Sequence, residues 1–257
     1  MYTKLSRAFT LIELLVVLFV LAAIAGIAIP VVTSVTAQSH GATGAASIAN
    51  LDSSFRTAQA SKGRVGAAGF DSLIDSSNNV IGYLMYPGDG LVVCDLASPD
   101  ASSPIPDAAT AQRVANALVN AGITSVRLMN DDATTGDATF VNTAADVPIT
   151  TAPSGTVLAI DHATFQTDLP LDPSKLYVVF GLGDDSALQG KVVAESPTFI
   201  PVSASAREKY SNFVVVYQIP TGTNPTAQYA SAGMPMKAGV LGINHHLKVY
   251  HQARDDQ

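Results

Sequence analysis

Residues 9–32 read FTLIELLVVLFVLAAIAGIAIPVV, and this stretch decides the architecture of the chain. Nineteen residues from Leu14 to Val32 carry no charge, which is about the length that crosses the hydrocarbon core of a bilayer. One acid, Glu13, lies at the start of this apolar run. A carboxylate in a membrane segment costs about 2.5–3.5 kcal/mol at mid-membrane and less near the end, and it usually marks function. The functional interpretation therefore depends on Glu13.

A short basic leader, MYTKLSRA at residues 1–8, precedes the apolar run and holds Lys4 and Arg7 but no acid. By the positive-inside rule, we expect the leader to stay in the cytoplasm and the chain beyond the apolar run to be carried across. A secretory signal peptide would use residues 23–25, Ala-Ile-Ala, as its cleavage site, but Glu13 interrupts the apolar region. A plain membrane anchor explains the length of the run and leaves Glu13 without a role.

A third interpretation rests on a family resemblance. The segment resembles the N-terminus of type IV pilins and type II secretion pseudopilins, in which a prepilin peptidase removes a basic leader. The new N-terminal residue of that family is usually an N-methylated Phe followed by Thr-Leu-Ile-Glu, and Phe9 to Glu13 match at every position. The resemblance implies cleavage between Ala8 and Phe9 and N-methylation of Phe9. The family usually has Gly before the cut; Ala8 is small enough for a tight peptidase site, although inefficient processing would leave an anchored precursor.

The resemblance also implies a role for Glu13 in assembly. Cleavage creates a positive amine at Phe9, and a neighbouring subunit in a helical filament can present its Glu13 to that amine. Removing one partner of such a buried pair costs about 3–5 kcal/mol, because the other charge is left unpaired. We therefore expect Glu13 to set the register between subunits. The alternative is a carboxylate that reaches the lipid headgroups.

Pro30 occupies the position of a proline that many pilins carry. Proline removes one helical hydrogen bond and clashes with the preceding turn, and Gly26 adds flexibility four residues earlier. Together they predict a kink or a locally melted stretch in the filament. The alternative is that the helix leaves the membrane at this point.

The whole chain predicts an α+β fold, in which a long N-terminal α-helix, the membrane and filament spine, packs on a mostly antiparallel β-sheet domain. We expect a leader at 1–8, a hydrophobic helix at 9–62 with its transmembrane part at about 11–32, and an extracytoplasmic globular α+β domain at 63–257. The helix should run from about Thr10 to about Ala60, with stop signals at 62–66. Its sparse apolar stripe, which should dock on the domain, consists of Val35, Ile48, Leu51, Phe55 and Ala58.

Further elements follow from turn signals, caps and β-branched runs. Asp107 is a good N-cap for a helix that runs to Asn120, with Gly122 beyond its end. Residues 131–152 are polar and loop-like. The expected strands are 80–86 and 91–97 around a turn at 87–90, then 123–129, 157–160, 176–183, 213–219, 238–243 and 247–252.

A second, weaker resemblance covers the later half of the chain. Residues 181–193, 195–201 and 210–219 are similar to segments of large prepilin-like proteins that are abundant in planctomycete-type bacteria. This similarity implies no activity.

Composition excludes several classes of function. The net charge is −7, and it becomes −9 if Lys4 and Arg7 leave with the leader; no basic patch favours nucleic-acid binding. The single cysteine, Cys94, cannot form an intrachain disulfide and is expected to be a buried small hydrophobe. The chain has no P-loop, nucleophile elbow or metalloprotease helix, so no enzymatic activity is predicted.

Three clusters have residue types that ligate metals, but each has a simpler interpretation. His245, His246 and His251 favour a solvated strand edge, because no cysteine completes a zinc site. Asp131, Asp132 and Asp137 favour a polar turn, because they lack the spacing of a calcium loop. For Asp184 and Asp185, calcium binding is a weaker alternative. No metal and no cofactor is therefore predicted.

We conclude from the sequence that the chain is a structural subunit of a type IV pilus-like filament. Its expected partners are prepilin peptidase, identical or related pilin subunits, and inner-membrane lipids before assembly, with no nucleic acid. It would be a single-pass inner-membrane protein with a cytoplasmic N-terminus, and then part of an extracellular filament or a periplasmic pseudopilus. The alternatives are a pseudopilin of a type II secretion system and a membrane-tethered extracytoplasmic binding protein that never polymerises.

Overall fold

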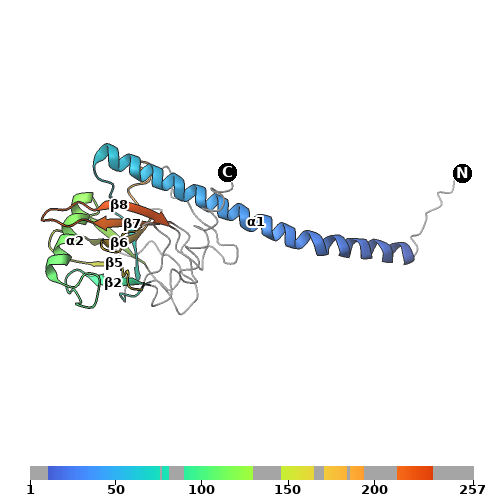
Figure 1. Ribbon diagram of the computed structural model, residues 1–257, viewed down its shortest axis with the longest axis horizontal. Helices are drawn as coiled ribbons and strands as arrows, with labels where there is room; N and C mark the ends of the chain where they lie inside the picture. Colours follow the sequence, from blue (N-terminus) through green and yellow to red (C-terminus); the bar gives the residue numbers. More distant parts are fainter. Residues whose placement is uncertain are drawn as a thin grey trace.

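The computed structural model describes residues 11–75, 77–80, 90–129, 146–164, 171–183, 186–193 and 213–233. Within the first helix, side chains are described for 11–25, 43 and 46–62. Two helices and eight strands are present in these ranges (Figure 1). In chain order they are α1 (Leu11–Lys62), β1 (Phe70–Asp75), β2 (Leu91–Asp95), α2 (Ala108–Ala121), β3 (Ser125–Met129), β4 (Asp146–Pro148), β5 (Thr156–Ile160), β6 (Leu176–Gly181), β7 (Val214–Ile219) and β8 (Gln228–Gly233).

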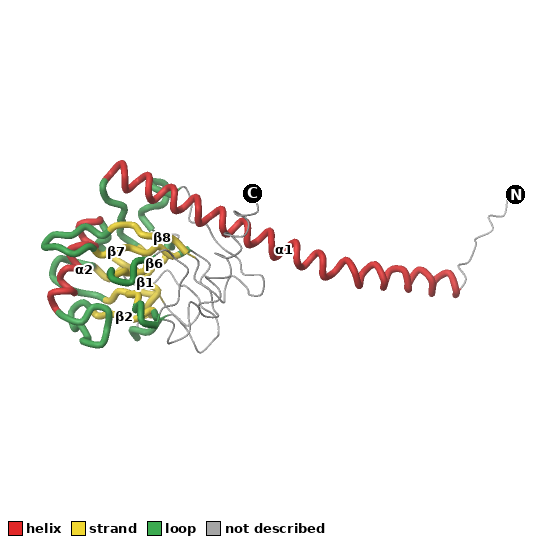
Figure 2. Tube along the Cα trace, in the orientation of Figure 1, coloured by secondary structure: helices red, strands yellow, loops and turns green. Residues whose placement is uncertain are grey.

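Helix α1 is 52 residues long, which corresponds to about 78 Å at 1.5 Å per residue. Its N-terminal half extends beyond the rest of the described protein, and its last turns lie along the sheet beside β8 (Figures 1 and 2). The helix ends where the sequence predicts. Gly63 takes a left-handed φ of +70°, and its amide donates to the Gln59 carbonyl at 2.8 Å.

The eight strands form one sheet in which β1 and β3 are the parallel pair and the other described pairs are antiparallel. β7 pairs with β6 and carries β8 on its other side. β6 also pairs with β5 at Val178 and Val179, and with β1 at Gly181. The sheet therefore divides beyond β6 into one arm of β5 and β2 and another of β1, β3 and β4. This α+β architecture with a mostly antiparallel sheet confirms the predicted fold class.

Both helices pack on the same face of the sheet. Leu51 and Phe55 of α1 and Val114 and Leu118 of α2 belong to one buried cluster together with Phe180 of β6. Successive side chains of a strand point to opposite faces of the sheet, so the strand residues next to those of the first cluster form a second apolar cluster on the opposite face. That cluster contains Leu73, Ile74, Leu158, Ile160, Tyr177, Val179, Val214 and Val216. The central strands are thus apolar on both faces.

The second helix follows its sequence signals closely. The Asp107 carboxylate accepts a hydrogen bond from the Thr110 amide at 2.7 Å, which is the geometry of an N-cap. Gly122 closes the helix in the left-handed conformation, with φ 97°. Val114, Ala115 and Leu118 form its apolar face and are fully buried.

Several strands differ from the prediction. β1 and β8 were not expected, and the expectation that 131–152 is wholly loop is wrong, because β4 lies within it. β4 is only three residues long and pairs with β3. Its strand conformation is therefore stabilised by this pairing, and its own short sequence gives no strand signal. The expected strands at 238–243 and 247–252 lie outside the described residues, as does 81–86 of the expected hairpin.

Candidate functional site

The first turns of α1 carry the most exposed apolar surface of the described protein. All of its large exposed hydrophobic side chains lie between Leu11 and Ile24, with Leu11 82% and Phe19 75% exposed. The others are Ile12, Leu14, Leu15, Val16, Val17, Leu18, Val20, Leu21 and Ile24. They surround the helix and do not form one stripe, because consecutive residues from 14 to 21 are all exposed and apolar. A helix that is apolar on all sides is suited to burial in lipid or among other helices.

Glu13 is the acid within this segment and lies in the first turn of α1. Its side chain is exposed. A carboxylate in the first turn interacts favourably with the positive end of the helix dipole, so the helix itself tolerates Glu13 here. Ala8 and Phe9 lie outside the described residues. Cleavage between them, N-methylation of Phe9 and a register role for Glu13 stay predictions.

The helix backbone is continuous through Gly26 and Pro30. The side chains at these two positions are not among those described. The predicted kink or melted stretch concerns the assembled filament, and it stays a prediction.

The C-terminal part of α1 is fastened to β8 by aromatic and polar contacts. The ring of Phe55 stacks on the ring of Tyr229 with centroids 4.8 Å apart. Arg56 donates to the Ala230 carbonyl at 3.3 Å, lies 5.8 Å from the centroid of the Tyr229 ring and pairs with Asp52 at 2.7 Å. The Asp52 carboxylate, through its hydrogen bond, raises the pKa of Arg56. One helix therefore joins an exposed apolar segment, from Leu11 to Ile24, to a C-terminal part that is docked on the sheet.

Residues 3–29 match the family model of the prokaryotic N-terminal methylation motif. This motif is the class III prepilin signal of type IV pilins and pseudopilins, so the resemblance drawn from Phe9 to Glu13 is confirmed. The motif supports a type IV pilin- or pseudopilin-like precursor. The motif implies processing by prepilin peptidase, a membrane-anchored N-terminus and assembly with related subunits. Searches of curated proteins and of solved structures each give no match to the chain.

Among the described residues, no helix combines the length and the apolar character that a membrane span requires. The motif match ends at residue 29, so the planctomycete-like similarity of the later half stays a prediction.

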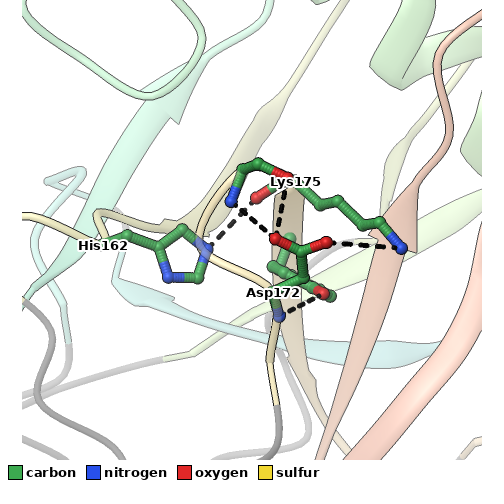
Figure 3. A network of polar contacts seen from close by, with 5 residues as sticks. His162, Asp172 and Lys175 are labelled. Atoms are coloured by element: carbon green, nitrogen blue, oxygen red, sulfur yellow. Dashed lines mark hydrogen bonds and ion pairs between the residues drawn. The ribbon is translucent and has the colours of Figure 1, made fainter.

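A second site candidate, which the sequence did not single out, lies where the two described ends of the connection between β5 and β6 meet (Figure 3). His162 Nε2 lies 3.1 Å from the Lys175 carbonyl, and the Tyr177 hydroxyl accepts a hydrogen bond from the Asp172 amide at 3.1 Å. Asp172 also accepts bonds from the amide and hydroxyl of Ser174, which lower its pKa, and its other oxygen faces Lys175 Nζ at 3.8 Å.

These contacts join the two ends of the connection between β5 and β6. The imidazole faces a backbone carbonyl and not a hydroxyl, so the geometry is not that of a nucleophile and its base. The bordering cavity of about 350 Å³ is lined mainly by loop residues. The network is best understood as a connection that holds β5 and β6 in position.

The metal-ligand candidates lie beyond the reach of the structure. His245, His246, His251, Asp131, Asp132, Asp137, Asp184 and Asp185 all fall outside the described residues. Within the described ranges, no group of three or more His, Cys, Asp or Glu side chains is placed to hold a metal ion.

Cys94 is a buried free cysteine in the helix-covered core, as predicted. Burial raises the pKa of its thiol, which keeps the sulfur protonated and unreactive.

The site residue that sequence reasoning missed is Tyr229. It lies in β8, whose sequence QYASAG has little β-branched character and gave no strand signal.

Proposed function

We propose that this protein is a structural subunit of a type IV pilus-like filament. It enters the inner membrane as a single-pass precursor with a cytoplasmic N-terminus, is cut after Ala8, is N-methylated at Phe9 and polymerises through α1. The observation that carries this proposal is the division of α1 into an exposed apolar segment from Leu11 to Ile24, which lies within the methylation motif, and a C-terminal part docked on the sheet domain.

The energetics support a role in which this apolar segment is covered. Burying a Val, Leu, Ile or Phe side chain contributes about 1.5–3 kcal/mol, and eleven such side chains are exposed between Leu11 and Ile24. Lipid covers them in the precursor. Because lipid tails are as apolar as leucine, transfer from lipid to a filament core needs packing and polar contacts as its driving terms. A pair between Glu13 of one copy and the Phe9 amine of another supplies the polar term and fixes the register.

The same motif is found in pseudopilins, so a subunit of a type II secretion pseudopilus is the second candidate. The two differ in where the filament ends. A pilus subunit is recovered from the cell exterior by shearing, whereas a pseudopilus subunit stays in the periplasm. In either case the role is structural and not enzymatic.

The first test is the mass of the N-terminal peptide from native membranes or sheared filaments. A peptide that begins at methylated Phe9 supports prepilin processing. An intact Met1 indicates that Ala8 blocks the peptidase and favours a tethered protein, and Ala8→Gly should then restore cleavage. A start near Gly26 means ordinary secretion and removes the pilin interpretation.

The second test separates assembly from anchoring. Glu13→Ala should leave the protein in the membrane fraction but abolish sheared or periplasmic filaments, while Glu13→Asp, which keeps the charge, should retain part of the assembly. Filaments at the wild-type level in Glu13→Ala would show that no charge pair sets the register. A binding activity that survives in Glu13→Ala would favour the non-polymerising tethered protein.

A further inference from the structure

A second surface of the protein has the chemistry of an anion-binding groove. It lies between the last three turns of α1 and the tight turn at 188–193, and its volume is about 350 Å³. Its lining consists of Ser53, Ser54, Thr57, Ala58, Ser61, Lys62, Lys191 and Val192. We propose that this groove receives a side-chain carboxylate of a neighbouring copy of the chain, a proposal that rests on the filament function proposed above.

Helical spacing brings the hydroxyl groups of the groove together. Ser53, Thr57 and Ser61 follow one another at intervals of four residues and so share one face of α1. This face lies beside the one that carries Asp52 and Arg56, which form their own i,i+4 pair. The groove side of α1 is therefore separate from the polar contacts that fasten the helix to β8.

The turn at 188–193 contributes Lys191 to the lining of the same groove. Leu188 is buried in the core, and its carbonyl accepts from the Lys191 amide at 3.1 Å. Gly190 takes φ +70°, and its amide donates to the Val193 carbonyl at 2.7 Å, which closes the turn. The lysine is thus presented from an ordered loop.

The donors of the groove are not committed to partners within the described part of the chain. Neither Lys62 nor Lys191 makes an ion pair there, in contrast to Lys175 and Arg56, which pair with aspartates. The hydroxyls of Ser53, Ser54 and Thr57 make no hydrogen bond in the same described ranges, while Ser61 donates to the Ala58 carbonyl at 3.1 Å. Among the described residues that line the groove there is no carboxylate.

Two ammonium groups beside uncommitted hydroxyls form a site for a negatively charged group. A neighbouring copy is the partner to which the proposal commits, because each copy carries 21 acidic residues that can supply a carboxylate and the proposed filament brings copies into contact. Lipid phosphate is the other source of anions near this protein. Thr57 lies 25 residues beyond Val32, which is about 38 Å of helix, so the groove is far from the headgroups that flank the apolar run.

The test is zero-length crosslinking of the full chain in native sheared filaments or membranes. A carbodiimide joins an ammonium to a carboxylate only where the two are in contact. We expect crosslinked dimers on a denaturing gel in which mass spectrometry finds Lys62 or Lys191 joined to an Asp or Glu. Lys62→Gln/Lys191→Gln should lose these dimers. Lys175→Gln is the matched control, because Lys175 already faces Asp172, and it should leave the dimers unchanged.

Charge reversal gives an independent measurement. Lys62→Glu/Lys191→Glu should reduce the yield of filaments, whereas Lys62→Arg/Lys191→Arg should retain it, and equal protease resistance of the globular domain in both variants shows that folding is intact. Wild-type filaments whose dimers are joined only through other lysines would overturn this inference and leave the filament function standing. Absence of any wild-type filament or pseudopilus would overturn both.

Discussion

The rings of Phe55 and Tyr229 stack with their centroids 4.8 Å apart and their planes inclined by 23°. Arg56, the next residue of α1, donates a hydrogen bond to the carbonyl of Ala230, which is 174 residues away in the sequence. Tyr229 also meets the edge of Tyr217, with ring centroids 6.4 Å apart. The last turns of α1 are thus part of the aromatic core of the sheet domain. A filament built on α1 would therefore be coupled directly to the sheet of each subunit.

Replacement of Phe55 should uncouple the helix from the domain. Phe55 is fully buried, so Phe55→Ala removes its packing and leaves a cavity, which costs about 3–5 kcal/mol. We expect a lower urea midpoint for the full chain in detergent, followed by tyrosine fluorescence because the chain has no Trp. Phe19→Ala is the matched control, since Phe19 is 75% exposed and should leave the midpoint unchanged. Equal midpoints for the two variants would show that the docking of α1 contributes little to stability.

The two tyrosines of this cluster should respond differently to loss of the hydroxyl. Tyr217 donates a hydrogen bond to the Val65 carbonyl, just after α1, whereas the buried hydroxyl of Tyr229 has no hydrogen-bond partner among the described residues. Tyr217→Phe leaves a buried carbonyl unsatisfied, which costs about 1–3 kcal/mol. Tyr229→Phe should be neutral or slightly stabilising. Urea titration of both variants is the measurement, and a reversed order would contradict the assigned bonding.

The same tyrosines predict sensitivity to alkaline pH. Burial raises the pKa of Tyr217 above its ordinary value of 10.0, and burial together with the nearby Asp52 carboxylate does the same for Tyr229. Above pH 10 the unfolded chain binds fewer protons than the folded one, so stability is complete below this pH and falls as the pH rises beyond it. The slope of unfolding free energy against pH should be smaller in Tyr217→Phe. An unchanged slope would mean that Tyr217 ionises freely in the folded protein.

The sequence predicts elements well where local signals and tertiary packing agree. Asp107 and Gly122 bound α2 as expected, because both caps act through bonds within a few residues. β6 and β7 are rich in β-branched and aromatic residues and are buried on both faces, so their composition alone identifies them. The stripe of Leu51 and Phe55 likewise shows which part of α1 docks.

Other elements depend on contacts that local patterns do not encode. β1 has the sequence FDSLID, in which Asp71 and Ser72 are buried and Leu73 takes a positive φ of 61° where the pairing with β3 changes register. Such a strand lacks the alternation that a sequence reader looks for. β8 is stabilised by pairing with β7 and by packing against α1. The exposed apolar segment of α1 was found from its sequence because a charge in an apolar run is unusual in itself.

Gly183 should tolerate no side chain, for a reason that the sequence did not reveal. A Cβ on Gly183 would lie 2.3 Å from Oδ2 of Asp71, which is only 5% exposed. Gly183→Ala therefore has to displace a buried carboxylate, and we expect a loss of about 1–3 kcal/mol in the free energy of unfolding. Gly190→Ala is the matched control: nothing lies within 4 Å of its Cβ, so only the strain of φ +70° remains, about 1 kcal/mol. Urea titration compares the two, and a Gly183→Ala variant as stable as the wild type would show that the Asp71 carboxylate can move away from the β6 end without cost.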